Sequence, residues 1–252
     1  PNAITEIFSR ILPQAKEGAD AASGYEELES EVPFLGEICM GHLRYSTTGK
    51  SGLSYVHPFL RRNNWRSRNL LMCGNFNLTN VEDVFESIVK RGQHPRLFSD
   101  TIVLLEQLGY SLDKENHRLY RELRDTLEDP ELGQAIENRL SMENVLRMAA
   151  PQGDGGFVIC GATGSGDMFV LRDSHGIRPA FYYIDDEIVV AASERPVIQT
   201  VFDVAADDVR ELMPGMSLIV SKQGDIKVER ILEEDTNRRC SFARIYFSRG
   251  RD

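Results

Sequence analysis

The 252-residue chain has few cysteines and no long apolar segment, and both features restrict its class. No C-x-x-C pair occurs, which argues against a zinc site and against a small disulfide framework. Scattered free cysteines fit a reducing, cytoplasmic location. No apolar run approaches the roughly 20 residues that span a bilayer, and the first residues lack the charged-then-apolar pattern of a secretory signal. The cysteines are Cys39, Cys73, Cys160 and Cys240.

Basic residues are also in the minority. The formal net charge at pH 7 is −10, from 29 basic and 39 acidic residues. Nucleic-acid-binding domains usually carry a basic face, so we expect neither a nucleic acid nor a membrane as a partner. One basic cluster, Arg61, Arg62, Arg66 and Arg68 around Trp65, is interpreted mainly as a solvated loop between strands. Binding of RNA or a nucleotide through this cluster is the least favoured alternative.

Phosphate-binding and metal-binding motifs are missing as well. The run Thr48–Ser51 resembles the end of a P-loop, but that motif needs a glycine where Arg44 stands. The glycines of Gly161–Gly166 lack the G-x-G-x-x-G spacing and join two predicted strands. The five histidines show no metal-ligand spacing, so no metal site is predicted. What is present is ordinary: 41% hydrophobic and 27% charged residues indicate a globular protein of one large or two small domains.

Short apolar runs bounded by Gly, Asn and Asp recur along the chain and predict β-strands. Several neighbouring runs are separated by short turns, at Gly164–Gly166, Asp185–Asp186 and Gln223–Asp225, which favours antiparallel pairing. The expected strands are Leu35–Leu43, Asn69–Gly74, Gly156–Gly161, Met168–Arg172, Ala180–Ile184, Glu187–Ala192, Met216–Ser221, Ile226–Leu232 and Ser241–Phe247.

Helices are expected in the middle of the chain. Asn80 is placed to cap one helix, and Ser99 or Asp100 a second. The charged, leucine-spaced stretch from about 113 to 148 predicts two more helices with a break near Asp129–Pro130, and 194–202 predicts a short one. Strands, then helices, then many antiparallel strands indicate an α+β fold, with two stacked antiparallel sheets flanked by helices.

Four segments carry residues suited to chemistry. Residues 41–49 (GHLRYSTTG) place an arginine on a turn, where it can bind a carboxylate in bidentate fashion. Residues 74–80 (GNFNLTN) offer side-chain amides and backbone N–H groups, which can bind an oxyanion. Ser99-Asp100 puts an acid at a helix start, and 172–179 (RDSHGIRP) precedes the sequence ASE. Each segment has a structural alternative, such as helix capping; their joint occurrence indicates a site.

The order GHLRYSTTG, GNFNLTN, SD, RDSHGIRP, ASE, MPG and CSFARIYFSRG resembles the class II glutamine amidotransferases, and among them the amidophosphoribosyltransferases. The resemblance runs from about Gly36 to Arg249. It implies an αββα sandwich of two antiparallel sheets flanked by helices, the N-terminal nucleophile hydrolase fold, missing its first strand and helix. It also implies a lead-in and acidic loop at 1–35, a glutaminase domain at 36–249, and a phosphoribosyltransferase domain that is absent from this chain.

The resemblance implies hydrolysis of glutamine to glutamate and ammonia, which the parent enzyme transfers to phosphoribosyl pyrophosphate in de novo purine synthesis. In the family an N-terminal Cys attacks the carboxamide, with its own α-amine as base. This chain begins with Pro1 and is expected to lack the segment that carries the nucleophile, so we expect it by itself to be inactive. No cofactor is expected in the chain, and Mg²⁺ only in the absent phosphoribosyltransferase domain. The implied partners are glutamine, that domain and further copies in a homo-oligomer.

Site residues follow from the resemblance, position by position. It implies that Arg44 binds the α-carboxylate of glutamine with Thr47 beside it, and that Asp100 binds the α-ammonium. The side-chain amide of Asn75 and the backbone N–H of Phe76 would donate to the tetrahedral oxyanion. Phe76 stands where the family usually has Gly, so either a narrower site or a shifted turn is expected. The alternative function is a non-catalytic sensing or scaffold domain of a divergent amidotransferase-like protein.

Overall fold

The computed structural model describes residues 36–43, 55–95, 97–236, 238–242 and 245. The chain divides into two compact units, residues 1–41 and 42–252. The described residues 36–43 form neither helix nor strand, so the strand expected at Leu35–Leu43 is wrong over this range.

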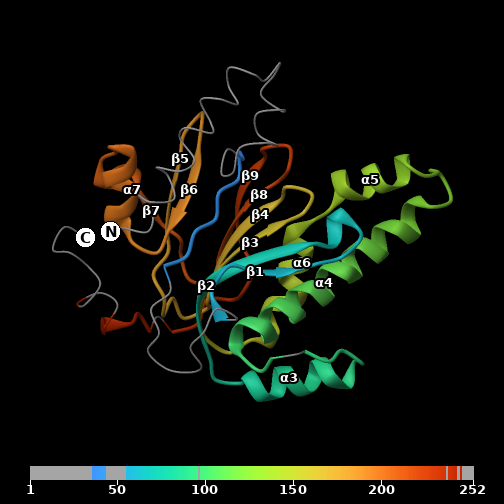
Figure 1. Cartoon of the computed structure of the whole chain (residues 1–252). Coiled ribbons are helices and arrows are strands. Elements are labelled where there is room, and N and C mark those ends of the chain that lie inside the picture. Colours follow the sequence, from blue (N-terminus) through green and yellow to red (C-terminus); the bar gives the residue numbers. More distant parts are fainter. Residues whose placement is uncertain (1–35, 44–54, 96, 237, 243–244, 246–252) are drawn as a thin grey trace, which may run out of the picture. The chain divides into compact units, whose positions relative to one another are not determined.

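The second unit contains two antiparallel sheets and several helices (Figure 1). The described strands are β1 (Phe59–Arg61), β2 (Leu70–Leu78), β3 (Gly155–Thr163), β4 (Met168–Arg172), β5 (Phe181–Ile184), β6 (Val189–Ala192), β7 (Arg210–Glu211), β8 (Met216–Val220) and β9 (Ile226–Arg230). The described helices are η2 (Arg66–Arg68), α3 (Val81–Lys90), α4 (Asp100–Leu123), α5 (Glu131–Arg139), α6 (Met142–Ala149), η3 (Ala150–Gln152), α7 (Arg195–Phe202) and η4 (Ala206–Asp208).

The larger sheet has the strand order β1-β2-β3-β4-β8-β9 and the smaller one β6-β5-β7. Every neighbouring pair is antiparallel. The three expected hairpins are confirmed, because the turns at Gly164–Gly166, Asp185–Asp186 and Gln223–Asp225 join β3 to β4, β5 to β6 and β8 to β9. Tight turns permit only this antiparallel arrangement.

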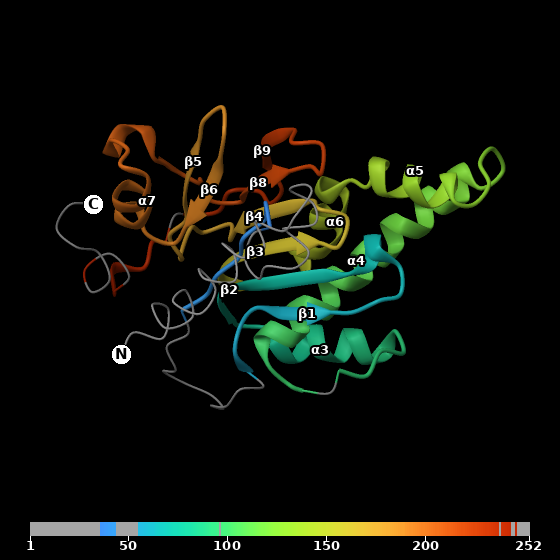
Figure 2. The same ribbon diagram turned by 45° about the horizontal axis from the view of Figure 1, so that its top comes forward.

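The layers follow from the alternation of side chains along the central strands. On β3, Phe157 and Ile159 pack into the core shared with α4, α5 and α6, whereas Val158 packs into a second core with Tyr182 of β5. Helices α4, α5 and α6 therefore cover one face of the larger sheet, and the smaller sheet covers the opposite face (Figures 1 and 2). Helix α7 lies against β5 and β6 and buries Ile198. The predicted α+β fold, with two antiparallel sheets flanked by helices, is confirmed.

The long helix α4 differs from the expectation. The helix predicted to begin near residue 113 is the continuation of α4, which runs for 24 residues from Asp100 to Leu123. Apolar residues three and four apart persist through this stretch and bury one face throughout. The break near Asp129–Pro130 is confirmed, since α5 begins at Glu131. Ser99 is the N-cap of α4, and its Oγ accepts the N–H of Ile102 at 3.4 Å.

The strand expected at Ser241–Phe247 is wrong over its described residues. Ser241, Phe242 and Ile245 are helical. A short apolar run of this kind fits a strand or a helix equally well, because it contains too few residues to define a period.

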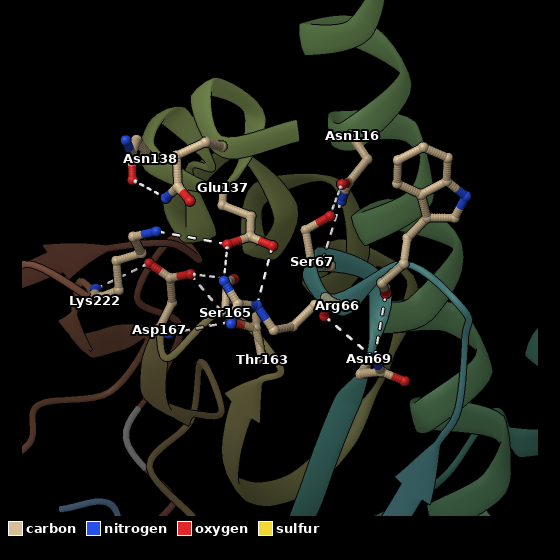
Figure 3. Close-up of polar contacts among 12 residues, drawn as sticks. Arg66, Ser67, Asn69, Asn116, Glu137, Asn138, Thr163, Ser165, Asp167 and Lys222 are labelled. Atoms are coloured by element: carbon tan, nitrogen blue, oxygen red, sulfur yellow. Dashed lines mark hydrogen bonds and ion pairs between the residues drawn. The ribbon is translucent and has the colours of Figure 1, made fainter. Parts of the chain in front are cut away.

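The basic cluster around residue 66 attaches its loop to the helices. Arg61 pairs with Asp113 of α4 at 2.5 Å, and Arg66 pairs with Glu137 of α5 at 2.6 Å. Figure 3 shows Glu137 between Arg66 and Lys222, whose Nζ lies 3.7 Å from the carboxylate. The hydrogen bond and charge of Arg66 lower the pKa of Glu137. These contacts hold α5 against the end of the larger sheet.

Candidate active site

Five residues were predicted from the sequence to bind glutamine or its oxyanion. Two of them, Arg44 and Thr47, lie outside the described residues. The other three, Asn75, Phe76 and Asp100, lie on β2 and at the start of α4. Asn75, Phe76 and Asp100 lie where β2 continues beyond the end of its pairing with β1.

Strand β2 is longer than the sequence predicts. It continues to Leu78 and pairs with β3 from Leu70 opposite Thr163 to Leu78 opposite Gly155. Alternation along the strand turns Phe76 and Leu78 toward the core beneath the helices. Asn75 and Asn77 therefore lie on the opposite face, and both are exposed. Among the described residues the side-chain amide of Asn75 has no hydrogen bond, so it is available to a ligand.

One edge of β2 is open beyond residue 72. Strand β1 pairs with β2 only over residues 70 to 72. The N–H of Gly74 donates to Nδ1 of His57 at 3.3 Å, and the N–H of Leu78 donates to Oδ2 of Asp100 at 3.0 Å. Residues two apart on a strand direct their N–H groups to the same edge, so the N–H of Phe76 points to this edge between them. No partner for it is found in the described part of the chain.

Asp100 stands at the first position of α4, where the helix dipole favours a negative charge. The side chain is half-buried, and its Oδ2 binds β2 as described. In the described ranges its Oδ1 has no hydrogen-bond partner. The structure thus brings Asp100 to the same strand edge as the N–H of Phe76, although 24 residues separate them in the sequence.

The Phe76 ring lies on the helix side of the sheet, opposite the Asn75 side chain. It stacks on the His57 ring with centroids 5.6 Å apart and an interplanar angle of 24°. A Cβ at residue 74 would collide with this ring and with the Val158 carbonyl oxygen, so glycine at 74 accommodates the phenylalanine. The expectation that this ring narrows the site stays a prediction. The ring lies beside His57 and not on the face of β2 that carries the Asn75 side chain.

Sequence reasoning missed two histidines that contact this strand. His57 is buried, and its ring lies 4.3 Å from that of His42, centroid to centroid, in a stacked arrangement. Nε2 of His42 donates to the carbonyl oxygen of Gly74 at 3.1 Å. The two imidazoles therefore bind the N–H and the C=O of one residue. No spacing rule could reveal this, because the contacts depend on the pairing of β1 with β2.

The fourth candidate segment, RDSHGIRP, serves the fold in the described structure. Arg172 and Asp173 are fully buried at the end of β4. Asp173 accepts hydrogen bonds from four backbone N–H groups, and Arg172 donates to three carbonyl oxygens and to Glu211 of β7. Charged groups this buried are tolerated only when they are satisfied in this way. The N–H donors belong to Phe157, His175, Ile177 and Arg178, and the acceptor carbonyls to Gly176, Arg178 and Leu212.

Cys73 lies on β2 directly before the candidate site and faces Cys160 across the β2–β3 pair. Their hydrogen bond lowers the pKa of Cys73, while the same bond and burial raise the pKa of Cys160 well above its usual value. Cys160 is therefore a thiol at neutral pH.

Over the described ranges, no group of three or more His, Cys, Asp and Glu side chains is arranged to hold a metal ion. No helix built from described residues combines the length and apolar character needed to cross a bilayer.

Comparisons with known proteins agree with this architecture. No protein-family model matches the chain. The amidophosphoribosyltransferase of Bacillus subtilis is 32% identical over 215 residues, which cover 85% of this chain and 38% of the relative. The amidophosphoribosyltransferase of Escherichia coli K12 is 27% identical over 222 residues, which cover 85% of this chain and 39% of the relative. The chain therefore spans about two fifths of these curated relatives.

Solved structures show the same relationship. The glutamine phosphoribosylpyrophosphate amidotransferase from B. subtilis, complexed with ADP and GMP, matches with a TM-score of 0.56 and 26% identity over 82% of this chain and 38% of its own. A structure described as the allosteric regulatory enzyme of purine biosynthesis matches with a TM-score of 0.55 and 28% identity, over 82% of this chain and 38% of its own.

Fold and relatives together show two antiparallel sheets with helices that match the N-terminal nucleophile hydrolase fold of the amidophosphoribosyltransferase structures. The resemblance seen in the sequence is confirmed. The chain is homologous to the glutamine amidotransferase region of the amidophosphoribosyltransferases.

Proposed function

We propose that this chain is the region of an amidophosphoribosyltransferase that hydrolyses glutamine to glutamate and ammonia. The parent protein transfers this ammonia to phosphoribosyl pyrophosphate in de novo purine synthesis. Homology to proteins of that name supports the proposal. The observation that carries it is the N–H of Phe76, which lies on an open strand edge between His57 and Asp100 and directly follows Asn75.

In the proposed reaction, the α-ammonium of glutamine binds Oδ1 of Asp100. Arg44 and Thr47, which lie outside the described residues, are assigned to the α-carboxylate. The carboxamide oxygen then lies against the N–H of Phe76 and the amide of Asn75, which stabilise the negative charge of the tetrahedral intermediate. Each such donor is worth about 2.7–4 kcal/mol of transition-state stabilisation.

The nucleophile is a cysteine thiolate whose own α-amine acts as base. Its sulfur bonds to the carboxamide carbon, ammonia leaves with the proton from the amine, and water cleaves the thioester to glutamate. A polypeptide that starts at Pro1 carries no thiol on its first residue. We therefore expect residues 1–252, prepared as such, to hydrolyse no glutamine.

The remaining partners follow from the same proposal. They are a phosphoribosyltransferase domain, which alone would require Mg²⁺, and further copies of the protein in a homo-oligomer. The coverage of about two fifths of each relative supports the presence of another domain in the parent. A cytoplasmic location fits the free cysteines of the described chain.

The test compares two ammonia sources in the natural gene product that contains this chain. Phosphoribosylamine formation is measured with glutamine and with free ammonia, and residues 1–252 alone serve as the control. We expect both sources to support the natural protein and the control to release no glutamate. A natural protein that uses ammonia but never glutamine would contradict the proposal and favour a sensing or scaffold role.

A further inference from the structure

We propose that His57 is a positioning residue of the glutamine site, which holds the strand with the oxyanion donors and the helix with Asp100 in one fixed geometry. This inference rests on the proposed function. It assigns His57 no contact with glutamine. Its effect is transmitted through Gly74 on one side of the ring and Thr101 on the other.

The first contact replaces a missing ladder bond. Phe59 pairs with Met72, and two further steps in the same register set His57 opposite Gly74. Strand β1 does not extend that far, so the backbone groups of Gly74 would be left at an open edge. An unpaired N–H away from water is costly. Nδ1 of His57 accepts this N–H at 3.3 Å, so the side chain takes the place of the neighbouring strand.

The second contact follows from the proton on the ring. Because Nδ1 accepts a backbone N–H, it carries no proton, and in the neutral ring the proton is on Nε2. Nε2 lies 3.3 Å from Oγ1 of Thr101 and donates to it. His57 and Thr101 are 8% and 7% exposed, so water competes little for these bonds. One neutral imidazole thus connects β2 to the first turn of α4.

Together these contacts surround the proposed oxyanion donor. Along the edge of β2, the N–H of Phe76 lies between Gly74, which binds His57, and Leu78, which binds Asp100. Asp100 directly precedes Thr101, so the two elements are joined on both sides of Phe76. The Phe76 ring also stacks on His57. A shift of β2 relative to α4 would therefore misplace the N–H of Phe76 relative to the carboxylate of Asp100.

Two conservative variants separate the two contacts. In Asn, Oδ1 occupies the place of the histidine Nδ1, so His57→Asn keeps an acceptor for Gly74 and loses the bond to Thr101. In Gln, Nε2 occupies the place of the histidine Nε2, so His57→Gln keeps the donor to Thr101 and loses the bond to Gly74. Each change removes one neutral hydrogen bond, which corresponds to roughly a tenfold effect or less.

The expected kinetics differ between the variants. In the natural gene product, His57→Gln should lower kcat with glutamine about tenfold with little change in KM, because the oxyanion donor on β2 is displaced. His57→Asn should raise KM for glutamine about tenfold with little change in kcat, because the helix start with Asp100 is displaced. Activity with free ammonia should be unchanged in both, because it depends on the proposed phosphoribosyltransferase domain. The parameter that each variant keeps, KM in one and kcat in the other, shows that the glutamine site still folds.

A matched variant and a spectroscopic measurement complete the test. Thr101→Val removes the hydroxyl at nearly constant volume and should raise KM for glutamine as His57→Asn does. The double variant His57→Asn, Thr101→Val should show little further rise in KM, because both changes remove the same hydrogen bond. In protein labelled with ¹⁵N-histidine, His57 should show an unprotonated Nδ1 and a protonated Nε2. A protonated Nδ1, or wild-type kcat and KM for glutamine in both His57 variants, overturns the positioning role alone. A wild-type protein without glutamine-dependent activity overturns the proposed function and the positioning role with it.

Discussion

Oδ2 of Asp100 accepts the backbone N–H of Leu78 at 3.0 Å. This bond attaches the first turn of α4 to the open edge of β2. Oδ1 of the same carboxylate has no hydrogen-bond partner among the described residues, and it is the oxygen that we propose binds the ligand. Asp100 therefore has a structural contact and a proposed binding role at the same time. A substitution that removes the charge but keeps an acceptor for Leu78 separates the two.

Asp100→Asn is that substitution, because the amide oxygen of Asn can still accept the Leu78 N–H. Loss of a charge-assisted contact with the glutamine ammonium should cost about 1.5–3 kcal/mol. This corresponds to a rise of roughly tenfold to a hundredfold in KM for glutamine in the natural gene product. Activity with free ammonia should persist. Loss of both activities together would show that Asp100 is structural only.

Asn75→Ala tests the side-chain donor to the oxyanion. We expect kcat with glutamine to fall about 10²–10³-fold, with a smaller change in KM, because the donor acts mainly in the transition state. Asn77→Ala is the matched control, since Asn77 is also exposed and lies two residues along on the same face of β2. The measurement is kcat and KM for glutamine in both variants, by steady-state kinetics. Equal effects at both positions would argue against a role for Asn75 in the oxyanion site.

Glu115 should make stability depend on pH. It is buried in α4 and accepts hydrogen bonds from Arg118 at 2.8 Å and from Asn144 of α6 at 3.1 Å. Burial disfavours its charge, but the bonds from Arg118 and Asn144 outweigh burial and lower the pKa of Glu115. A lowered pKa means that the carboxylate stabilises the fold above its unfolded pKa of about 4.3, and that this stabilisation is lost as the pH falls through the folded pKa.

Glu115→Gln should therefore reduce the free energy of unfolding by about 1–3 kcal/mol at pH 7 and by less below about pH 4. Urea unfolding of both proteins at several pH values measures this difference. Glu122→Gln is the control, because Glu122 also pairs with Arg118, at 2.8 Å, but is exposed. It should cost less than about 1 kcal/mol. A loss for Glu115→Gln that is independent of pH would contradict the prediction.

Gly109→Ala should destabilise the protein although it lies inside a helix. A Cβ at this position would collide with the Arg61 side chain, which pairs with Asp113 and Glu106. Displacing Arg61 should outweigh the usual gain of about 1 kcal/mol for Gly to Ala in a helix. Gly133→Ala in α5 is the control, since a Cβ there meets nothing within 4 Å and should stabilise. In an Arg61→Ala background, Gly109→Ala should also stabilise, as thermal or urea unfolding will show.

Local patterns predicted much of this fold. Alternating apolar residues and Gly- or Asp-containing turns identified β3, β4, β5, β6 and their hairpins, because strand pairing across a short turn is a local property. The cap at Ser99 and the break near residues 129–130 are local as well. The strand expected at 241–247 was wrong over its described residues, because a run that short carries no period long enough to separate helix from strand.

The sequence by itself determined most of the element types, the class of fold and the motif order that indicates a glutamine amidotransferase. It also placed Asn75 and Phe76 directly after a strand expected to end at Gly74, whereas β2 continues through both residues to Leu78. Only the tertiary structure decided that Asp100 meets this strand at Leu78, that His57 binds Gly74, and that the Phe76 N–H lies between these two contacts. These bonds join residues 17 and 22 positions apart. They depend on where β1 stops pairing with β2 and how α4 packs on the sheet, which no local spacing encodes.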